Sequence, residues 1–243
     1  MKRFDISTFV LHIIAMIFML CDHLWATLIP GNQWLTCLGR LAFPMFAYMT
    51  VEGYFHTSNL KRYVLRLLLL AVISEIPFNL MYSSSFIYPF HQNVIWTLLL
   101  GMGLIHVNEF AAGKDKLWLR IGTGCITVLL GWLIGMLTLV DYYGVGVVTI
   151  LVFYFLRKRT WWCLLGQIAT LYYLNVEVLG GFQFEVNIMG KTIPIVQQGL
   201  ALFALIPIWL YRGRKGYNRK WFQYACYGFY PLHMLLLYLL RSL

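Results

Sequence analysis

The stretch FVLHIIAMIFMLCDHLWATLI, residues 9–29, is apolar along almost its whole length. A helix needs about 20 such residues to cross the hydrocarbon core of a membrane, so the stretch predicts a transmembrane helix. Asp22 and His23 stand side by side about two thirds of the way along it, where ionisable groups are costly unless they face partners. The stretch passes through this pair without a small-residue cleavage site, so we expect a retained helix and not a signal peptide.

The rest of the chain has the same character. It has 243 residues, of which 60% are hydrophobic and 12% charged. Soluble domains contain about a quarter charged residues, so this composition is typical of a protein that crosses the bilayer several times. We predict an all-α integral membrane protein, a polytopic bundle that forms a single transmembrane domain over residues 1–243. The expected spans, about nine in number, lie at residues 9–29, 34–55, 63–82, 93–111, 118–139, 143–156, 161–179, 194–211 and 221–240.

The basic residues indicate how the bundle is oriented. The net charge is +10, which in a soluble protein would suggest nucleic acid as a partner. Here nearly all of the 19 lysines and arginines fall in alternate links between apolar spans, and positively charged links stay in the cytoplasm. We therefore predict a cytoplasmic N-terminus, an external C-terminus and a multi-pass location in the cell membrane, a bacterial inner or plasma membrane. The expected partners include membrane lipids and exclude nucleic acid.

A layer of polar residues is expected in the outer half of the membrane. With a rise of about 1.5 Å per residue, several independent spans place ionisable or amide side chains at a similar depth. Such groups turn inward and find partners. A purely structural role would explain a single pair, but a layer shared by several helices favours a functional site. The candidate catalytic residues are Asp22, His23, Arg40, Glu75, Asn93 and Asp141, and Gln92, Tyr142, Tyr143 and His233 are expected near them.

The side chains of Asp22 and His23 are expected to point in different directions. Neighbouring residues on a helix diverge by about 100°, so Asp22 need not be the carboxylate that orients His23. Glu75 or Asp141 could orient it instead. Arg40 could pair with Glu75 or Asp22, and we expect Asp22 to be its partner. No metal site is expected, because the five cysteines lie in apolar segments without paired CxxC spacing.

Polar residues also gather at the predicted inner ends of the spans. Arg62 and Arg66 are four residues apart and so share one helix face, where two guanidinium groups could hold phosphates. Topogenic charge or contact with lipid headgroups would also explain most of these residues. The candidates for binding a phosphorylated donor are His56, Arg62, Arg66 and Arg157, with Glu52 beside them.

An ordered set of short motifs runs through nearly the whole chain. The motifs are Asp22-His23, Gly39-Arg40-x-x-Phe43-Pro44, Val51-Glu52-Gly53-Tyr54-x-His56-Thr57, Tyr63-x-x-Arg66, Ser74-Glu75-Ile76-Pro77-Phe78, Gln92-Asn93-Val94, Asp141-Tyr142-x-Gly144 and the helix of His233. This set resembles the TraX family of membrane proteins, named for a conjugation protein that acetylates the pilin N-terminus. The resemblance implies acyl transfer from cytoplasmic acetyl-CoA to an amine or hydroxyl acceptor in or across the membrane, such as a peptide N-terminus or a glycan.

The resemblance also implies roles for the candidate residues. His23 would act as general base or carry the acetyl group itself. Arg40 or Asn93 would stabilise the oxyanion, while Asp22, Glu75 or Asp141 would set the tautomer of His23. A transporter or flippase that uses the same buried charges as a substrate or proton path is the alternative, although no internal repeat supports it. A non-catalytic membrane scaffold is the third class.

Overall fold

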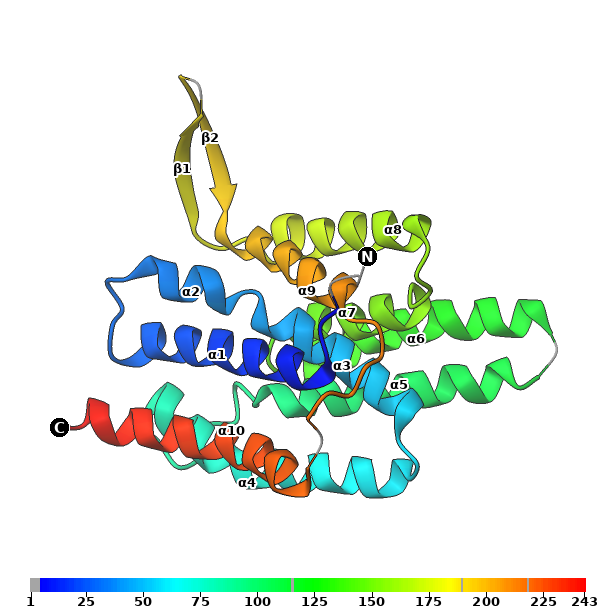
Figure 1. Cartoon of the computed structure of the whole chain (residues 1–243), viewed down its shortest axis with the longest axis horizontal. Coiled ribbons are helices and arrows are strands. Elements are labelled where there is room, and N and C mark those ends of the chain that lie inside the picture. The colour runs from blue at the N-terminus through cyan, green and yellow to red at the C-terminus, as the bar shows by residue number, and fades with distance from the viewer. Residues whose placement is uncertain (1–4, 115, 189, 218) are drawn as a thin grey trace. The chain divides into compact units, whose positions relative to one another are not determined.

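A computed structural model of the chain describes residues 5–114, 116–188, 190–217 and 219–243. Within these ranges the chain is helical apart from one β-hairpin, so the predicted all-α class is confirmed with that exception (Figure 1). The helices are α1 (Thr8–Thr27), α2 (Gln33–Gly39), α3 (Ala42–His56), α4 (Leu60–Ser83), α5 (Val94–Ala112), α6 (Leu117–Leu137), α7 (Tyr143–Phe155), α8 (Trp161–Tyr172), the π-helix η1 (Tyr173–Leu179), the 3-10 helix η2 (Gln197–Ala204), α9 (Leu205–Leu210) and α10 (Lys220–Arg241). The strands are β1 (Gln183–Ile188) and β2 (Lys191–Val196).

Four of the described helices are long and apolar enough to cross a membrane, namely α1, α4, α5 and α6. They coincide with four of the predicted spans. α7 and the η2–α9 segment are shorter apolar helices. A membrane protein is therefore confirmed, whereas the number of crossings and the side on which each terminus lies stay predictions.

Three predicted spans are not continuous α-helices. The expectation of one continuous helix over residues 34–55 is wrong, because the helix is interrupted between the end of α2 at Gly39 and the start of α3 at Ala42. Pro44 has no N–H and its ring would clash with the carbonyl of Arg40 four residues earlier, so the helix restarts at Ala42 with proline in its first turn. Residues 161–179 change from α-helix to π-helix at Tyr173. The span expected at 194–211 corresponds to the apolar helical segment Gln197–Leu210, but its first three residues belong to β2 and a 3-10 helix precedes α9.

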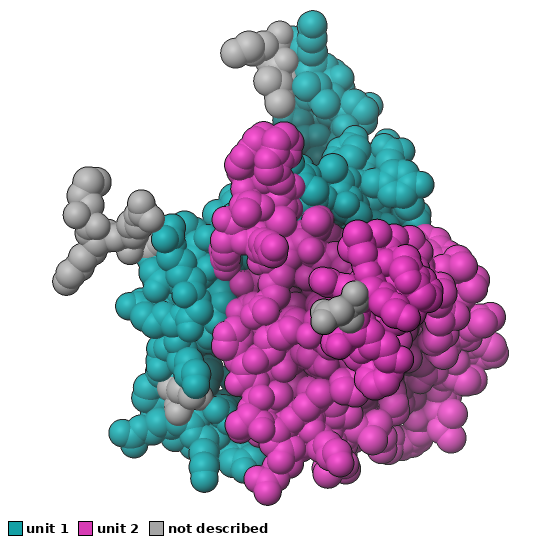
Figure 2. All heavy atoms as spheres, turned by 90° about the vertical axis from the view of Figure 1, so that its right-hand side faces the viewer, with its two compact units in different colours: residues 1–46, 165–243 teal, residues 47–164 magenta. Residues whose placement is uncertain are grey.

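The chain divides into two compact units (Figure 2). Unit 1 comprises residues 1–46 and 165–243, and unit 2 comprises residues 47–164. In unit 1, α1 packs against α2 and α10, and η2 packs against η1, α2, α9 and β2. In unit 2, α5 packs against α4, α6 and α7, and α6 also packs against α7.

Glycines allow close helix contacts in unit 2. A Cβ atom at Gly135 of α6 would lie 2.6 Å from the carbonyl oxygen of Tyr143, at the start of α7. No side chain fits at that distance, so glycine is needed there. The Gly131-x-x-x-Gly135 pattern thus marks a real helix–helix contact, as small residues at this spacing do in membrane bundles.

Candidate functional site

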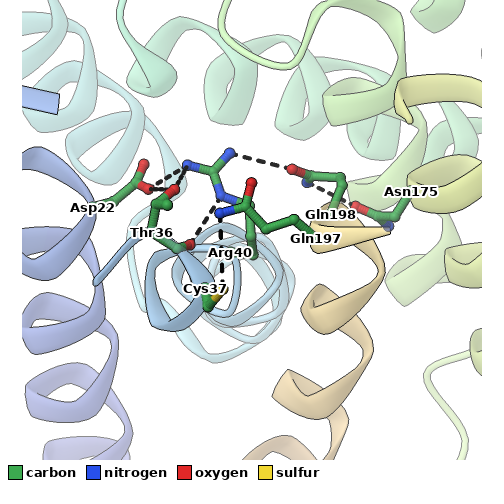
Figure 3. Close-up of polar contacts among 7 residues, drawn as sticks. All are labelled: Asp22, Thr36, Cys37, Arg40, Asn175, Gln197 and Gln198. Carbon is green, nitrogen blue, oxygen red and sulfur yellow. Dashed lines mark hydrogen bonds and ion pairs between the residues drawn. The ribbon is translucent and has the colours of Figure 1, made fainter. Parts of the chain in front are cut away.

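A connected polar network in unit 1 is centred on Arg40, the residue that follows α2. Its Nη2 forms an ion pair with Oδ1 of Asp22 on α1 (Figure 3). Its Nε donates to the carbonyl oxygen of Thr36 at 3.3 Å, and Nη2 also donates to Oγ1 of Thr36 at 3.2 Å. Thr36 in turn donates to Oδ1 of Asp22 at 2.8 Å. The ion pair expected between Asp22 and Arg40 is therefore present, and a threonine is bonded to both partners.

The network continues from Arg40 to buried amides on two further elements. Nη1 of Arg40 donates to Oε1 of Gln198 at 3.2 Å, and Nε2 of Gln198 donates to Oδ1 of Asn175 at 3.0 Å. Gln198 lies in the first turn of η2, and Asn175 lies in the π-helix η1. Both amides are buried. π-Helical turns are frequent at functional sites, and here the π-helix carries the amide that accepts the bond from Gln198 (Figure 3).

Gly39 lets α2 approach α1 at this network. A Cβ atom at Gly39 would overlap the side chain of Asp22, whereas at Gly31 in the preceding link nothing lies within 4 Å. The carboxylate of Asp22 therefore lies against bare backbone. Asp22 and Arg40 have side chains that are 21% and 19% exposed, so the ion pair is largely removed from solvent.

His23 faces a different partner from its neighbour Asp22. Its Nδ1 lies 2.7 Å from Nε2 of His233 on α10, and the two rings are nearly parallel, with an interplanar angle of 7°. Nδ1 of His233 lies 2.7 Å from the carbonyl oxygen of Phe229, one helical turn earlier. The prediction that Asp22 and His23 point in different directions is confirmed. The partner of His23 is a second histidine, where a carboxylate was expected.

This arrangement determines the tautomers of two neutral rings. A carbonyl oxygen can only accept, so Nδ1 of His233 carries a hydrogen and its Nε2 is an acceptor. Nδ1 of His23 must then donate to that acceptor, which leaves the lone pair of its own Nε2 unused. Among the described residues, the side-chain hydrogen bond of His23 is made through Nδ1, and Nε2 takes no part in it. We call the series Phe229 carbonyl, His233 and His23 the histidine relay.

Glu75 and Asn93 lie together in unit 2. Asn93 donates from Nδ2 to Oε2 of Glu75 and to the carbonyl oxygen of Ala71, the latter at 2.9 Å. Nε1 of Trp96 donates to the same glutamate oxygen at 3.0 Å. Oε1 of Glu75 is buried and has no partner among the described residues. This cluster joins α4 to the start of α5.

Asp141 contacts a histidine that the sequence interpretation missed. Nε2 of His91 lies 3.3 Å from Oδ1 of Asp141, and the amide of Tyr142 donates to the same oxygen at 3.1 Å. Tyr142 and Tyr143 both have positive φ, 59° and 47°, a conformation that costs energy for residues with side chains. The backbone of Gln92 holds this turn, because its amide donates to Leu139 and its carbonyl accepts from Asp141. The one sequence signal for His91 was its position directly before Gln92.

The predicted donor-binding residues separate into two groups within unit 2. Arg157 donates from Nε to Oε1 of Glu52 at 2.9 Å and its guanidinium lies 4.0 Å from the ring centre of Phe55. His56 approaches the same carboxylate at 3.7 Å. Arg62 and Arg66 are exposed on the first two turns of α4. Glu52 therefore contacts both Arg157 and His56, whereas Arg62 and Arg66 lie on α4.

The described helices and the buried ionisable network define a membrane-embedded α-helical protein whose polar side chains are held by specific partners. The family model described as TraX protein matches residues 7–241, so the chain belongs to the TraX family, as its motifs indicated. A "Probable fimbrial assembly protein FimC, serogroup H1" from Dichelobacter nodosus is 27% identical over 97% of this chain and 96% of that protein. No solved structure matches the chain.

Proposed function

We propose that this protein is an integral-membrane acyltransferase that moves an acetyl group from acetyl-CoA to an amine or hydroxyl acceptor. The observation that carries the proposal is the histidine relay, which leaves Nε2 of His23 with an available lone pair. General bases and nucleophiles in acyl transfer need such a nitrogen, oriented through its other ring atom. Membership of a family whose named member acetylates pilin supports the same chemistry.

The relay can support either of two roles for His23. As a nucleophile, Nε2 attacks the thioester carbon, the C–S bond breaks and the CoA thiolate leaves. The ring is then positively charged, and the Nδ1–H bond to His233 stabilises that charge. An acceptor amine or hydroxyl next attacks the acetyl carbon, the bond from that carbon to Nε2 breaks, and the acceptor's proton passes to the CoA thiolate, which restores neutral His23. As a general base, Nε2 instead takes the acceptor's proton while the acceptor attacks the thioester directly; the C–S bond breaks and the proton then passes from Nε2 to the CoA thiolate.

Arg40 is the group proposed to stabilise the oxyanion. Its guanidinium belongs to the same unit as the relay, and it pairs with Asp22, the sequence neighbour of His23. Thr36 and Gln198 fix its plane, so the group is already oriented before charge develops on the substrate. Donors organised in this way contribute most to stabilising an oxyanion.

Arg62 and Arg66 are exposed and lie four residues apart on α4, so they are candidates for the phosphates of the donor. Arg157, which pairs with Glu52 and lies over the ring of Phe55, would bind a phosphate in exchange for the carboxylate. Charge-assisted bonds from two guanidinium groups on one helix face suit a polyanion. The fimbrial description of the relative favours a polypeptide acceptor over a glycan.

The proposal is tested with purified protein in lipid nanodiscs. Release of free CoA from acetyl-CoA is followed with a thiol reagent, and acetylated protein is sought by mass spectrometry. His23→Ala should abolish release while the protein stays folded, whereas the exposed His106→Gln in unit 2 should behave like the parent chain. Full activity of His23→Ala would remove the mechanism. If acetyl-CoA produces neither release nor a thermal shift while a small solute does shift the midpoint, the transporter alternative replaces the proposal.

A further inference from the structure

The β-hairpin of unit 1 has one face on which two cross-strand pairs are wholly apolar. Its register pairs Phe184 with Ile195 and Val186 with Ile193, and side chains alternate between the faces of a strand. The other face carries the pairs Gln183–Val196, Glu185–Pro194 and Asn187–Thr192. Figure 1 shows the hairpin extending away from the helices of its unit. Two strands standing alone are marginal in stability, so this hairpin is an element to which a further strand would add favourably.

The two edges of the hairpin differ in their ability to bind another strand. The amide of Gln197 donates to the carbonyl of Phe182 at 2.8 Å, which makes this the first hydrogen-bonded pair at the base. Bonded and non-bonded pairs alternate in an antiparallel ladder, so Gln183, Glu185 and Asn187 point their backbone groups outward on β1. On β2 the central outward position is Pro194, which has no N–H. Proline thus blocks the β2 edge, and the β1 edge is open.

The open edge begins beside the proposed catalytic residues. Phe182, which precedes β1, makes an edge-to-face contact with Trp25, two residues after His23, with ring centres 6.3 Å apart. At the end of β2 the chain enters η2, where Gln198 bonds Arg40. A strand added along β1 would therefore have one end at the base of the hairpin. That base contacts Trp25, which lies within one helical turn of His23 on α1.

We propose that the β1 edge binds an extended segment of the polypeptide that accepts the acetyl group. This inference rests on the proposed function and adds how the acceptor is held. Outward N–H and C=O groups at alternate residues match another backbone in extended conformation, because each finds a partner of the opposite kind. A lipid headgroup has no matching row of alternating hydrogen-bond donors and acceptors.

A second copy of this chain is a poor occupant of the same edge. If two β1 edges paired antiparallel about their central outward residue, Glu185 would face Glu185, and like charges directly opposite each other destabilise a sheet. A segment with a basic residue at that position would instead gain a favourable cross-strand pair. The edge therefore favours a foreign, cationic extended segment.

The experiment blocks one edge at a time with proline. Glu185→Pro places a proline at an outward position of β1, so the ladder to β2 is kept while the open edge loses its central donor. Thr192→Pro makes the same change at an outward position of β2, whose edge is already blocked. Glu185→Gln removes the charge alone. The probe is a fluorescein-labelled peptide of about eight residues, alternating valine and threonine with one central lysine, a typical strand length. Its binding to protein in nanodiscs is followed by anisotropy.

We expect Glu185→Pro to weaken peptide binding by about ten-fold or more, and Thr192→Pro to leave it within about two-fold. Glu185→Gln should have an intermediate effect that shrinks in high salt. Equal losses in both proline variants, or no binding to the parent chain, would overturn the proposal. Release of CoA from acetyl-CoA without acceptor is measured on the same samples and should be unchanged in all three variants. A parent chain that binds the peptide but neither releases CoA nor shows a thermal shift with acetyl-CoA would refute the proposed function and leave the strand-binding edge intact.

Discussion

The ion pair of Asp22 and Arg40 makes a quantitative prediction for stability. Removing one partner of a fully buried ion pair costs about 3–5 kcal/mol, because the other charge is left uncompensated. A surface pair contributes about 0–1 kcal/mol. Since the two side chains are 21% and 19% exposed, solvent screens part of the effect. We therefore expect Asp22→Leu and Arg40→Met each to lower the free energy of unfolding by about 2–3 kcal/mol.

The double variant should cost much less than the sum of the two single variants. With both charges removed, no uncompensated ion remains, and replacing a buried pair by apolar groups is often close to neutral. The remaining cost is that of the lost Arg40 bonds to Gln198 and Thr36, about 1 kcal/mol for each bond. The coupling between the two substitutions should then be about 2 kcal/mol or more.

The assay is unfolding in mixed micelles, with sodium dodecyl sulfate as the denaturant and tryptophan fluorescence as the signal. Arg241→Met at the exposed end of α10 is the control for loss of one arginine and should change stability by less than about 0.5 kcal/mol. Additive single-variant effects would show that Asp22 and Arg40 do not act as a pair, and the description of the network would have to be abandoned.

The remaining predictions concern the relay and two close contacts. His233→Leu should lower kcat for acetyl transfer about 100-fold with little change in the KM for acetyl-CoA. His233→Gln still offers an acceptor oxygen to His23 and should retain much of the rate. Equal losses of kcat in the two variants would argue against the relay. Gly39→Ala should lower the free energy of unfolding by about 1–3 kcal/mol, because its Cβ would overlap the side chain of Asp22 on α1. Gly31→Ala should leave the free energy of unfolding unchanged, because nothing lies near its Cβ. Gly135→Ala should be similarly destabilising. Gly122→Ala lies on the same helix with open space around its Cβ and should stabilise the protein by about 0.5–1 kcal/mol. If Gly122→Ala proved more destabilising than Gly135→Ala, the close packing of α6 on α7 would be refuted.

Much of the fold was predictable from the sequence because length and apolarity decide whether a helix can cross a membrane. The ends of α1, α4, α5 and α6 agree with the predicted spans to within a few residues. The break after α2 was not predicted, although Pro44 signals it, because hydropathy does not register a missing N–H. The hairpin escaped prediction for a related reason. Its alternation is short, and Ile195 and Val196 were counted as part of the start of an apolar span.

The candidate site was predictable only where charge revealed it. Asp22 and Arg40 stand out in apolar runs, and their pairing follows from the cost of leaving either one alone. Asn175 and Gln198 complete the network but are neutral amides, whose depth in the fold depends on the π-helix and 3-10 helix that carry them. The sequence placed His233 near the candidate catalytic residues, but its direct bond to His23 depends on how α1 packs against α10.

Arg40 also interacts with the C-terminal end of α2, which is a short helix. Seven residues rise about 10 Å, a third of the thickness of a bilayer core, so α2 is a half-helix that cannot cross on its own. Its last carbonyl groups carry the negative end of the helix dipole. Arg40 places its guanidinium at that end and donates to the carbonyl of Thr36, so one side chain neutralises the helix terminus and the carboxylate of Asp22 together. A lysine could supply the charge, but its single ammonium could not reproduce the planar set of donors that closes the half-helix and holds Gln198 as well.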